Sequence, residues 1–168
     1  MSKNQGFTLL ELLITTSVTA LLMLAISSLF ITFLGSAYKT RLSQSLRESG
    51  THAMNQMIEM LRNANEISST CQDNLTEISM INSDGRSTIF KEDNDRIASI
   101  SGEQTFYLTD SPNNNDYVRN LLFSCTPTDS GKKYLSVSFM LQTSNESIES
   151  NNAKNAFLEF HSGVVTRN

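Results

Sequence analysis

The sequence has few of the residues from which active sites are usually built. It contains no tryptophan, two histidines, two cysteines and two prolines in 168 residues. Neither His52 nor His161 has a cysteine or a second histidine at a metal-ligand spacing. The chain also lacks a phosphate-binding glycine pattern, a G-x-S-x-G motif and any nucleophile–base or paired-acid constellation. The sequence therefore predicts no enzymatic activity, no cofactor and no metal site.

One acidic segment, Glu92-Asp93-Asn94-Asp95, offers oxygen ligands of the kind that Ca²⁺ prefers. It lacks the glycine and the closing glutamate of an EF-hand loop. A solvated turn is favoured over a calcium site.

Positive charge is also scarce. The 13 lysines and arginines are outnumbered by 17 acidic residues, which gives a net charge of −4. No stripe of basic residues is interleaved with aromatic residues, and Lys132-Lys133 is too short to follow a phosphate backbone. Nucleic-acid binding is not predicted.

Charge is absent altogether from residues 12–38. These 27 residues exceed the roughly 20 that cross a bilayer as a helix, and they exceed the apolar core of a secretory signal, which has about 7–15 residues. Eight of them are serine or threonine, which suits a helix that packs against other helices. The alternative is a cleaved secretory signal, because Gly35-Ser36-Ala37 resembles a signal-peptidase site.

The charges on either side of this run favour a cytosolic C-terminal part. Lys3 precedes the run, whereas Lys39, Arg41 and Arg47 follow it. Counted alone, these residues keep the C-terminal part in the cytosol by the positive-inside rule.

The residues before the run carry a short motif, Gly6-Phe7-Thr8-Leu9-Leu10-Glu11. A polar leader ends in glycine, phenylalanine follows, glutamate stands at the fifth position after the glycine, and a long apolar run begins. This combination resembles the prepilin signature of the type IV pilin superfamily. The resemblance covers residues 1–38.

The resemblance implies processing by a prepilin peptidase of the cytoplasmic membrane. The leader would be residues 1–6, the cut would fall between Gly6 and Phe7, and Phe7 would become the N-methylated terminus. The apolar helix would be retained and would later pack among other pilin or pseudopilin subunits, with an inner-membrane assembly platform as a further partner. Because the peptidase acts in the cytosol, the resemblance also places the C-terminal part outside the cytoplasm, against the charge count.

Glu11 needs a physical explanation, because a bare charge deep in a bilayer costs about 2.5–3.5 kcal/mol or more. In the first turn of a helix a carboxylate gains about 0.3–1 kcal/mol from the helix dipole. The resemblance implies a partner as well, the amine of Phe7 in the same or a neighbouring subunit. The alternative is an interfacial glutamate near the lipid head groups.

Two departures from major pilins point to a minor pilin or pseudopilin. The apolar run contains no proline, and the two cysteines are Cys71 and Cys125 in place of a late pair. In the oxidising compartment that the resemblance implies, these two can form a disulfide; the alternative is two buried thiols.

Beyond the apolar run the periodicity predicts first a helix and then strands. Apolar residues recur at helical spacing over residues 39–66, with Gly50 as a weak point or bend. After residue 76 the period becomes two, as in residues 133–141, where Leu135, Val137, Phe139 and Leu141 share one face. Strands are expected at residues 77–81, 87–91, 96–100, 104–108, 117–123, 133–141 and 156–160, with turns at 82–85 and 101–102.

The predicted fold class is α+β, with a long N-terminal helix packed against an antiparallel sheet. Its parts are a leader (1–6), a transmembrane and assembly helix (7–38), an amphipathic continuation (39–66) and a β-rich globular domain (67–168). The predicted function is a non-enzymatic filament subunit, anchored through residues 12–38 in the inner membrane with its globular domain outside. The alternative is a signal-anchored or secreted β-rich binding domain whose N-terminal motif is fortuitous.

Overall fold

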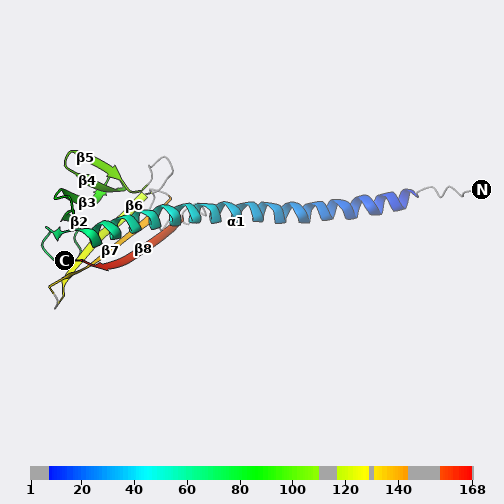
Figure 1. The fold of residues 1–168 in the computed structure, drawn as a ribbon. Helices are drawn as coiled ribbons and strands as arrows, with labels where there is room; N and C mark the ends of the chain where they lie inside the picture. Colours follow the sequence, from blue (N-terminus) through cyan, green and yellow to red (C-terminus); the bar gives the residue numbers. More distant parts are fainter. Residues whose placement is uncertain (1–7, 110–116, 129–130, 144–155, 168) are drawn as a thin grey trace, which may run out of the picture. The chain divides into compact units, whose positions relative to one another are not determined.

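The computed structural model describes residues 8–109, 117–128, 131–143 and 156–167. It contains one long helix followed by strands, so the predicted α+β class is confirmed (Figure 1). The chain divides into two compact units, an anchor unit of residues 1–40 and a head of residues 41–168. The elements are α1 (Leu9–Asn63), β1 (Glu66–Ile67), β2 (Glu77–Ile81), β3 (Ser87–Asp93), β4 (Arg96–Ser101), β5 (Gln104–Tyr107), β6 (Tyr117–Pro127), β7 (Lys133–Gln142) and β8 (Phe157–Val165).

The strands of the head form two antiparallel sheets. The five-stranded sheet has the order β1-β2-β3-β4-β5, and the three-stranded sheet has the order β6-β7-β8. Each strand pairs with the next one in the chain, except that β5 and β6 are not neighbours. The sequence predicted one antiparallel sheet, whereas the structure has two, each with its strands in chain order. The break falls between β5 and β6, at a segment that includes Pro112 and lies largely outside the described residues.

The two predicted turns are present and use glycine at positive φ. Gly85 (φ 80°) closes the turn between β2 and β3, where its amide donates to the carbonyl of Asn82 over 3.0 Å. Gly102 (φ 63°) lies between β4 and β5. These backbone conformations are unfavourable for residues with a side chain, so the glycines set the register of both hairpins.

The head's core lies between the second half of α1 and the two sheets. The alternation predicted for β7 is present, because Leu135, Val137, Phe139 and Leu141 are all buried. The helix contributes one buried stripe: Leu46, Gly50, Ala53, Met54, Met57, Ile58 and Leu61. α1 ends at Asn63 and not at residue 66, because β1 begins at Glu66 and the amide of Asn65 already donates to Ile81.

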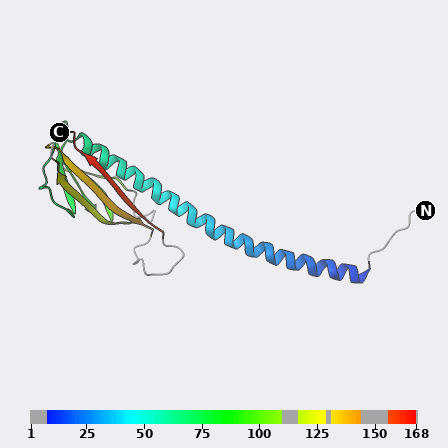
Figure 2. The same ribbon diagram turned by 90° about the horizontal axis from the view of Figure 1, so that it is seen from below.

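Gly50 is a contact point of the helix. It is buried within the continuous helix α1, and a Cβ placed on it would lie 2.2–2.7 Å from the ring of Phe160 on β8. The Phe160 ring stacks in turn on Phe139, with centroids 5.1 Å apart. In Figures 1 and 2, β8 accordingly runs beside the part of α1 that belongs to the head. The missing side chain allows the helix to approach this aromatic pair.

Replacing Gly50 by alanine should therefore destabilise the head. Alanine is the better helix former by about 1 kcal/mol, but its methyl group overlaps Phe160, and overpacking costs about 1–3 kcal/mol. Gly50→Ala should lower the denaturation midpoint of the detergent-solubilised chain, followed by near-ultraviolet circular dichroism. Gly35→Ala is the matched control, since nothing lies within 4 Å of a Cβ at that position. An unchanged midpoint for Gly50→Ala would contradict the contact.

Candidate functional site

The N-terminal end of α1 is capped by Thr8, the first described residue. Its side-chain oxygen accepts a hydrogen bond from the amide of Glu11 over 3.3 Å, and its carbonyl accepts one from Leu12 over 3.2 Å. A threonine oxygen that accepts the third amide of a helix is an N-cap, and such a cap contributes about 0.5–2 kcal/mol. The helix therefore begins immediately after Thr8. Gly6 and Phe7, the predicted cleavage and methylation positions, lie outside the described residues.

Glu11 lies in the first turn of α1 with its side chain exposed. A carboxylate there interacts favourably with the positive end of the helix dipole. Sequence reasoning missed Thr8, although a signal was present. Threonine followed three residues later by glutamate, just before an apolar run, is the pattern of a capping box. Thr8 and Glu11 thus belong to the same helix cap.

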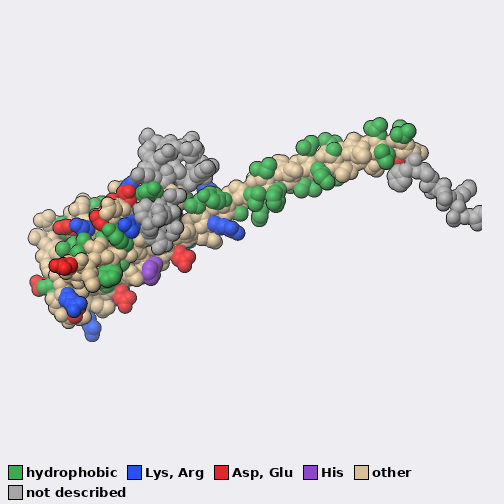
Figure 3. Space-filling view, turned by 90° about the horizontal axis from the view of Figure 1, so that it is seen from above, with side chains coloured by type: hydrophobic (Ala, Val, Ile, Leu, Met, Phe, Trp, Pro, Cys, Tyr) green, Lys and Arg blue, Asp and Glu red, His purple; other side chains and the backbone are tan. Residues whose placement is uncertain are grey.

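The anchor unit exposes a long apolar surface. Residues 9–36 are almost all exposed, including Leu9 (85%), Ile31 (71%) and Phe33 (67%). Figure 3 shows these apolar side chains along the helix, whereas charged side chains gather over the head. By length and composition α1 can cross a membrane, with a mean hydropathy of 2.2 over its most apolar window and none of that window buried within the chain. Such a surface requires lipid or other helices to cover it.

Most of the serine and threonine hydroxyls between residues 15 and 32 are satisfied by the helix itself. Thr15 donates to the carbonyl of Glu11 over 2.9 Å, Thr19 to that of Thr15 over 2.7 Å and Ser27 to that of Met23 over 2.8 Å. An unbonded hydroxyl would be costly in an apolar medium, and these bonds remove that cost. The hydroxyls are consequently compatible with a membrane environment as well as with contacts to other helices.

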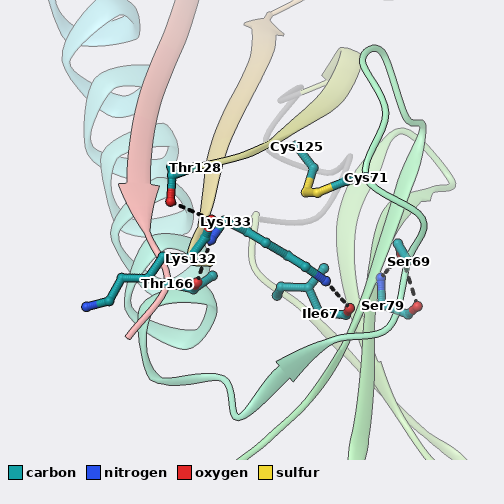
Figure 4. The surroundings of a disulfide bond; sticks show 9 residues. All are labelled: Ile67, Ser69, Cys71, Ser79, Cys125, Thr128, Lys132, Lys133 and Thr166. Atoms are coloured by element: carbon teal, nitrogen blue, oxygen red, sulfur yellow. Dashed lines mark hydrogen bonds between the residues drawn. A yellow bond between two sulfur atoms is a disulfide. The ribbon is translucent and has the colours of Figure 1, made fainter. Parts of the chain in front are cut away.

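Cys71 and Cys125 are joined in a disulfide, with their Cα atoms 4.7 Å apart (Figure 4). Cys71 belongs to the β1–β2 connection and Cys125 to β6, so the bond links the two sheets covalently. Cys125 is buried and Cys71 is half-buried. A covalent bond between residues 54 positions apart in the sequence restricts the unfolded chain strongly.

The acidic segment 92–95 comprises the end of β3 and the turn before β4, and the carboxylates of Asp93 and Asp95 bind side chains of the protein. Asp93 accepts a hydrogen bond from the hydroxyl of Tyr107 over 2.7 Å. Asp95 forms an ion pair with Arg119. Among the described residues, no group of three or more His, Cys, Asp or Glu side chains could hold a metal ion.

Glu92, at the start of this segment, has an unfavourable position for its charge. Partial burial raises its pKa above the ordinary value. A hydrogen bond from the amide of Leu121 and the nearby Arg119 guanidinium lower the pKa, and the Asp95 carboxylate raises it, but burial has the largest effect. The Glu92 carboxyl therefore contacts the edge of β6 at Leu121, and partial loss of solvent there disfavours its charged form.

The two histidines are exposed, His52 on α1 and His161 on β8. The Nε2 atom of His52, on α1, is 3.1 Å from the side-chain amide nitrogen of Gln56, one turn further along the helix. His161 is exposed on β8. The described residues thus place neither histidine in a catalytic arrangement.

Comparison with known proteins identifies the N-terminal segment alone. Residues 1–27 match the family model described as the prokaryotic N-terminal methylation motif, which is the type IV prepilin-like signal. No curated protein and no solved structure matches the chain. The motif includes Gly6, Phe7, Thr8 and Glu11, and it ends within the apolar part of α1.

The position of Glu92 predicts a pH-dependent stability. A carboxyl whose pKa is raised on folding contributes most stability below its ordinary pKa, and this contribution is lost as the pH rises through the raised pKa. Glu92→Gln, which cannot ionise, should therefore gain stability relative to the unmodified chain as the pH rises from about 4 to 7. Urea denaturation at both pH values measures this difference. Glu77→Gln, at an exposed position on β2, is the control; a Glu92→Gln difference that stays constant with pH would contradict the prediction.

Proposed function

We propose that this protein is a structural subunit of a type IV pilus-like or type II secretion-like filament, in the class of minor pilins and pseudopilins. The observation that carries the proposal is the N-terminal methylation motif at residues 1–27, continued by a helix that exposes an apolar surface throughout the anchor unit. The head supplies a folded domain with its own core. The proposed role requires no catalysis by this chain.

Maturation by a prepilin peptidase is the first step of this role. The motif makes the chain a substrate for such a peptidase, and we place the cut between Gly6 and Phe7, with methylation of the new Phe7 amine. In the mature chain Thr8 would be the second residue. Because Thr8 caps α1, the helix would begin at the third residue of the mature chain, and Glu11 would be its fifth residue.

In this proposal Glu11 sets the axial position of the helix relative to the helices of neighbouring subunits. Its carboxylate is the only charged side chain of residues 9–38, and in an apolar setting it requires an opposite charge. The Phe7 amine of its own chain or of a neighbouring subunit provides that charge. Charge-assisted hydrogen bonds of this kind are short and strong where water is excluded.

The remaining surface of the anchor helix suits packing against neighbouring helices. Small side chains leave a shallow depression of about 590 Å³ on one side, bordered by Thr15, Thr16, Thr19, Ala20, Met23, Leu24 and Ser27. Small residues allow helix backbones to approach closely in apolar surroundings. The partners are other pilin or pseudopilin subunits, and the assembly platform of the inner membrane delivers the chain to them.

The head lies outside the cytoplasm in this proposal. The chain is first a single-pass protein of the inner membrane and then part of a surface filament or pseudopilus. The oxidising conditions of that compartment agree with the disulfide between Cys71 and Cys125.

Processing gives the first test of this proposal. Mass spectrometry of the membrane-extracted protein should show loss of residues 1–6 and one added methyl group on Phe7. Gly6→Leu should accumulate as the full-length precursor, because a bulky residue replaces the glycine at the cut. A mature chain that begins near Tyr38 would support a secreted binding domain, and normal maturation of Gly6→Leu would refute the peptidase assignment.

Glu11 gives the second test, which concerns assembly and not processing. Glu11→Ala should be cut and should stay in the membrane, because loss of the charge lowers the cost of insertion. It should fail to enter filaments, since the contact with the Phe7 amine is lost. Glu11→Gln should show an intermediate defect and Glu11→Asp a milder one. Shearing followed by immunodetection of the head separates filament and membrane fractions.

Glu59→Ala is the matched control for this test. Glu59 is an exposed carboxylate on the same helix but within the head, so its removal should leave assembly unchanged. Wild-type amounts of Glu11→Ala in the filament fraction would make Glu11 an ordinary interfacial residue.

A further inference from the structure

The outer edge of β6 is covered by a short segment of the β1–β2 connection. Residues 71–75, here called the strap, lie along this edge. Leu75 and Phe123 exchange two backbone hydrogen bonds of 2.8 Å, and the amide of Cys125 donates to the carbonyl of Gln72 over 3.0 Å. The strap therefore takes the place of a neighbouring strand for one end of β6.

The other end of the β6 edge is covered by the turn between β3 and β4. The amide of Val118 donates to the carbonyl of Asp95 over 2.8 Å, and the amide of Leu121 bonds to the Glu92 carboxylate. The strap and this turn together pair the amides of β6 that face away from β7. An unpaired sheet edge is a template for strands of other chains, so both covers protect the head from pairing at this edge.

The two covers differ in how firmly they are held. The β3–β4 turn is part of a long hairpin whose strands pair over six residues. The strap lies in the connection between β1 and β2, and Gln72, Asp73 and Asn74 are exposed. Asn74 also adopts a positive φ of 60°, which is unfavourable for most residues with a side chain. The strap is thus held by a few backbone bonds, by a bond from the Asn74 amide to the Ser124 hydroxyl, by the partly buried Leu75 side chain and by the disulfide.

Loss of the strap would leave every strand pair of both sheets in place. Next to it, Ser69 and Ser79 bond each other and hold the start of the connection against β2 (Figure 4). On the far side β6 stays paired with β7 from Tyr117 to Pro127. The linkage between the sheets would also persist through Lys133, whose ammonium group donates to the carbonyl of Ile67 over 2.9 Å (Figure 4).

We propose that the strap is a redox-locked cover. With the Cys71–Cys125 disulfide formed, the strap stays on the edge of β6; with the disulfide reduced, the strap opens while both sheets remain folded. The device sets whether this edge of the head is accessible, and it closes when the head reaches an oxidising compartment.

The redox step involves two electrons. A dithiol reductant donates two electrons and two protons, the bond between the two sulfur atoms breaks, and Cys71 and Cys125 become thiols. The reductant becomes a cyclic disulfide. Locking is the reverse step, in which a disulfide of the oxidant accepts the electrons and protons.

Hydrogen exchange of the full chain in detergent tests the proposal, with and without dithiothreitol. Reduction should accelerate exchange of the Leu75, Phe123 and Cys125 amides by about tenfold or more, because the strap then opens by itself. The Leu135 and Leu141 amides of the central strand β7 serve as internal controls and should keep their protection. The double variant Cys71→Ser/Cys125→Ser, measured without reductant, should reproduce the reduced pattern.

Two results would overturn the proposal. If the amides of β7 lose protection together with those of the strap, the disulfide holds the whole head and not a local cover. If the strap amides stay protected after reduction, the backbone bonds suffice and the disulfide is no lock. The oxidised wild-type chain, treated with the already oxidised form of dithiothreitol, controls for effects of the reagent.

Discussion

The apolar surface of residues 9–38 is the constraint on which the rest of the molecule depends. No described part of the chain buries it, and free energy of the order of 25 cal/mol per Å² makes its exposure to water untenable. The chain therefore divides into an anchor unit that needs an external apolar environment and a head that buries its own apolar side chains. Because the head has its own core around Met57, Phe90 and Val137, it can fold while the anchor unit stays in lipid or among other helices.

Within the anchor unit, most hydroxyls are satisfied locally, whereas the Glu11 carboxylate needs a partner. The hydroxyls of residues such as Thr15 and Thr19 bond to carbonyls of their own helix, and the Thr8 oxygen receives the amide of Glu11. The Glu11 carboxylate is different, because the Thr8 cap bonds the backbone amide of Glu11 and not its carboxylate. Among residues 9–38 this carboxylate is the only charged side chain, so within that range it alone can select a partner by its sign.

Local patterns predicted the elements well, and long-range contacts account for the differences. The apolar run, the first-turn position of Glu11 and the alternation of β7 follow from periodicities of 3.6 and 2 residues, which the sequence displays directly. The contact of Gly50 was not predicted, because only the folded head brings Phe160 onto it. The split into two sheets was also missed, since strand propensity does not reveal which strands pair. The Thr8 cap was detectable from the Thr-x-x-Glu pattern, whereas the strap depends on Leu75 and Phe123 meeting across 48 residues (123 − 75).

The contacts of β6 show how two meanders become one head. The buried stripe of α1 supplies a shared apolar core but no register between the sheets, because apolar packing is non-directional. Register comes from polar and covalent links to β6 and its neighbour β7: Asp95 with Arg119 at one end, Cys71 with Cys125 at the other, and Lys133 with Ile67 beyond the disulfide. Two of these links start from a turn or connection of the five-stranded sheet, and the third starts from Ile67 in the short strand β1. These links therefore set how the two sheets are aligned with one another, whereas the hairpins set how the strands pair within each sheet.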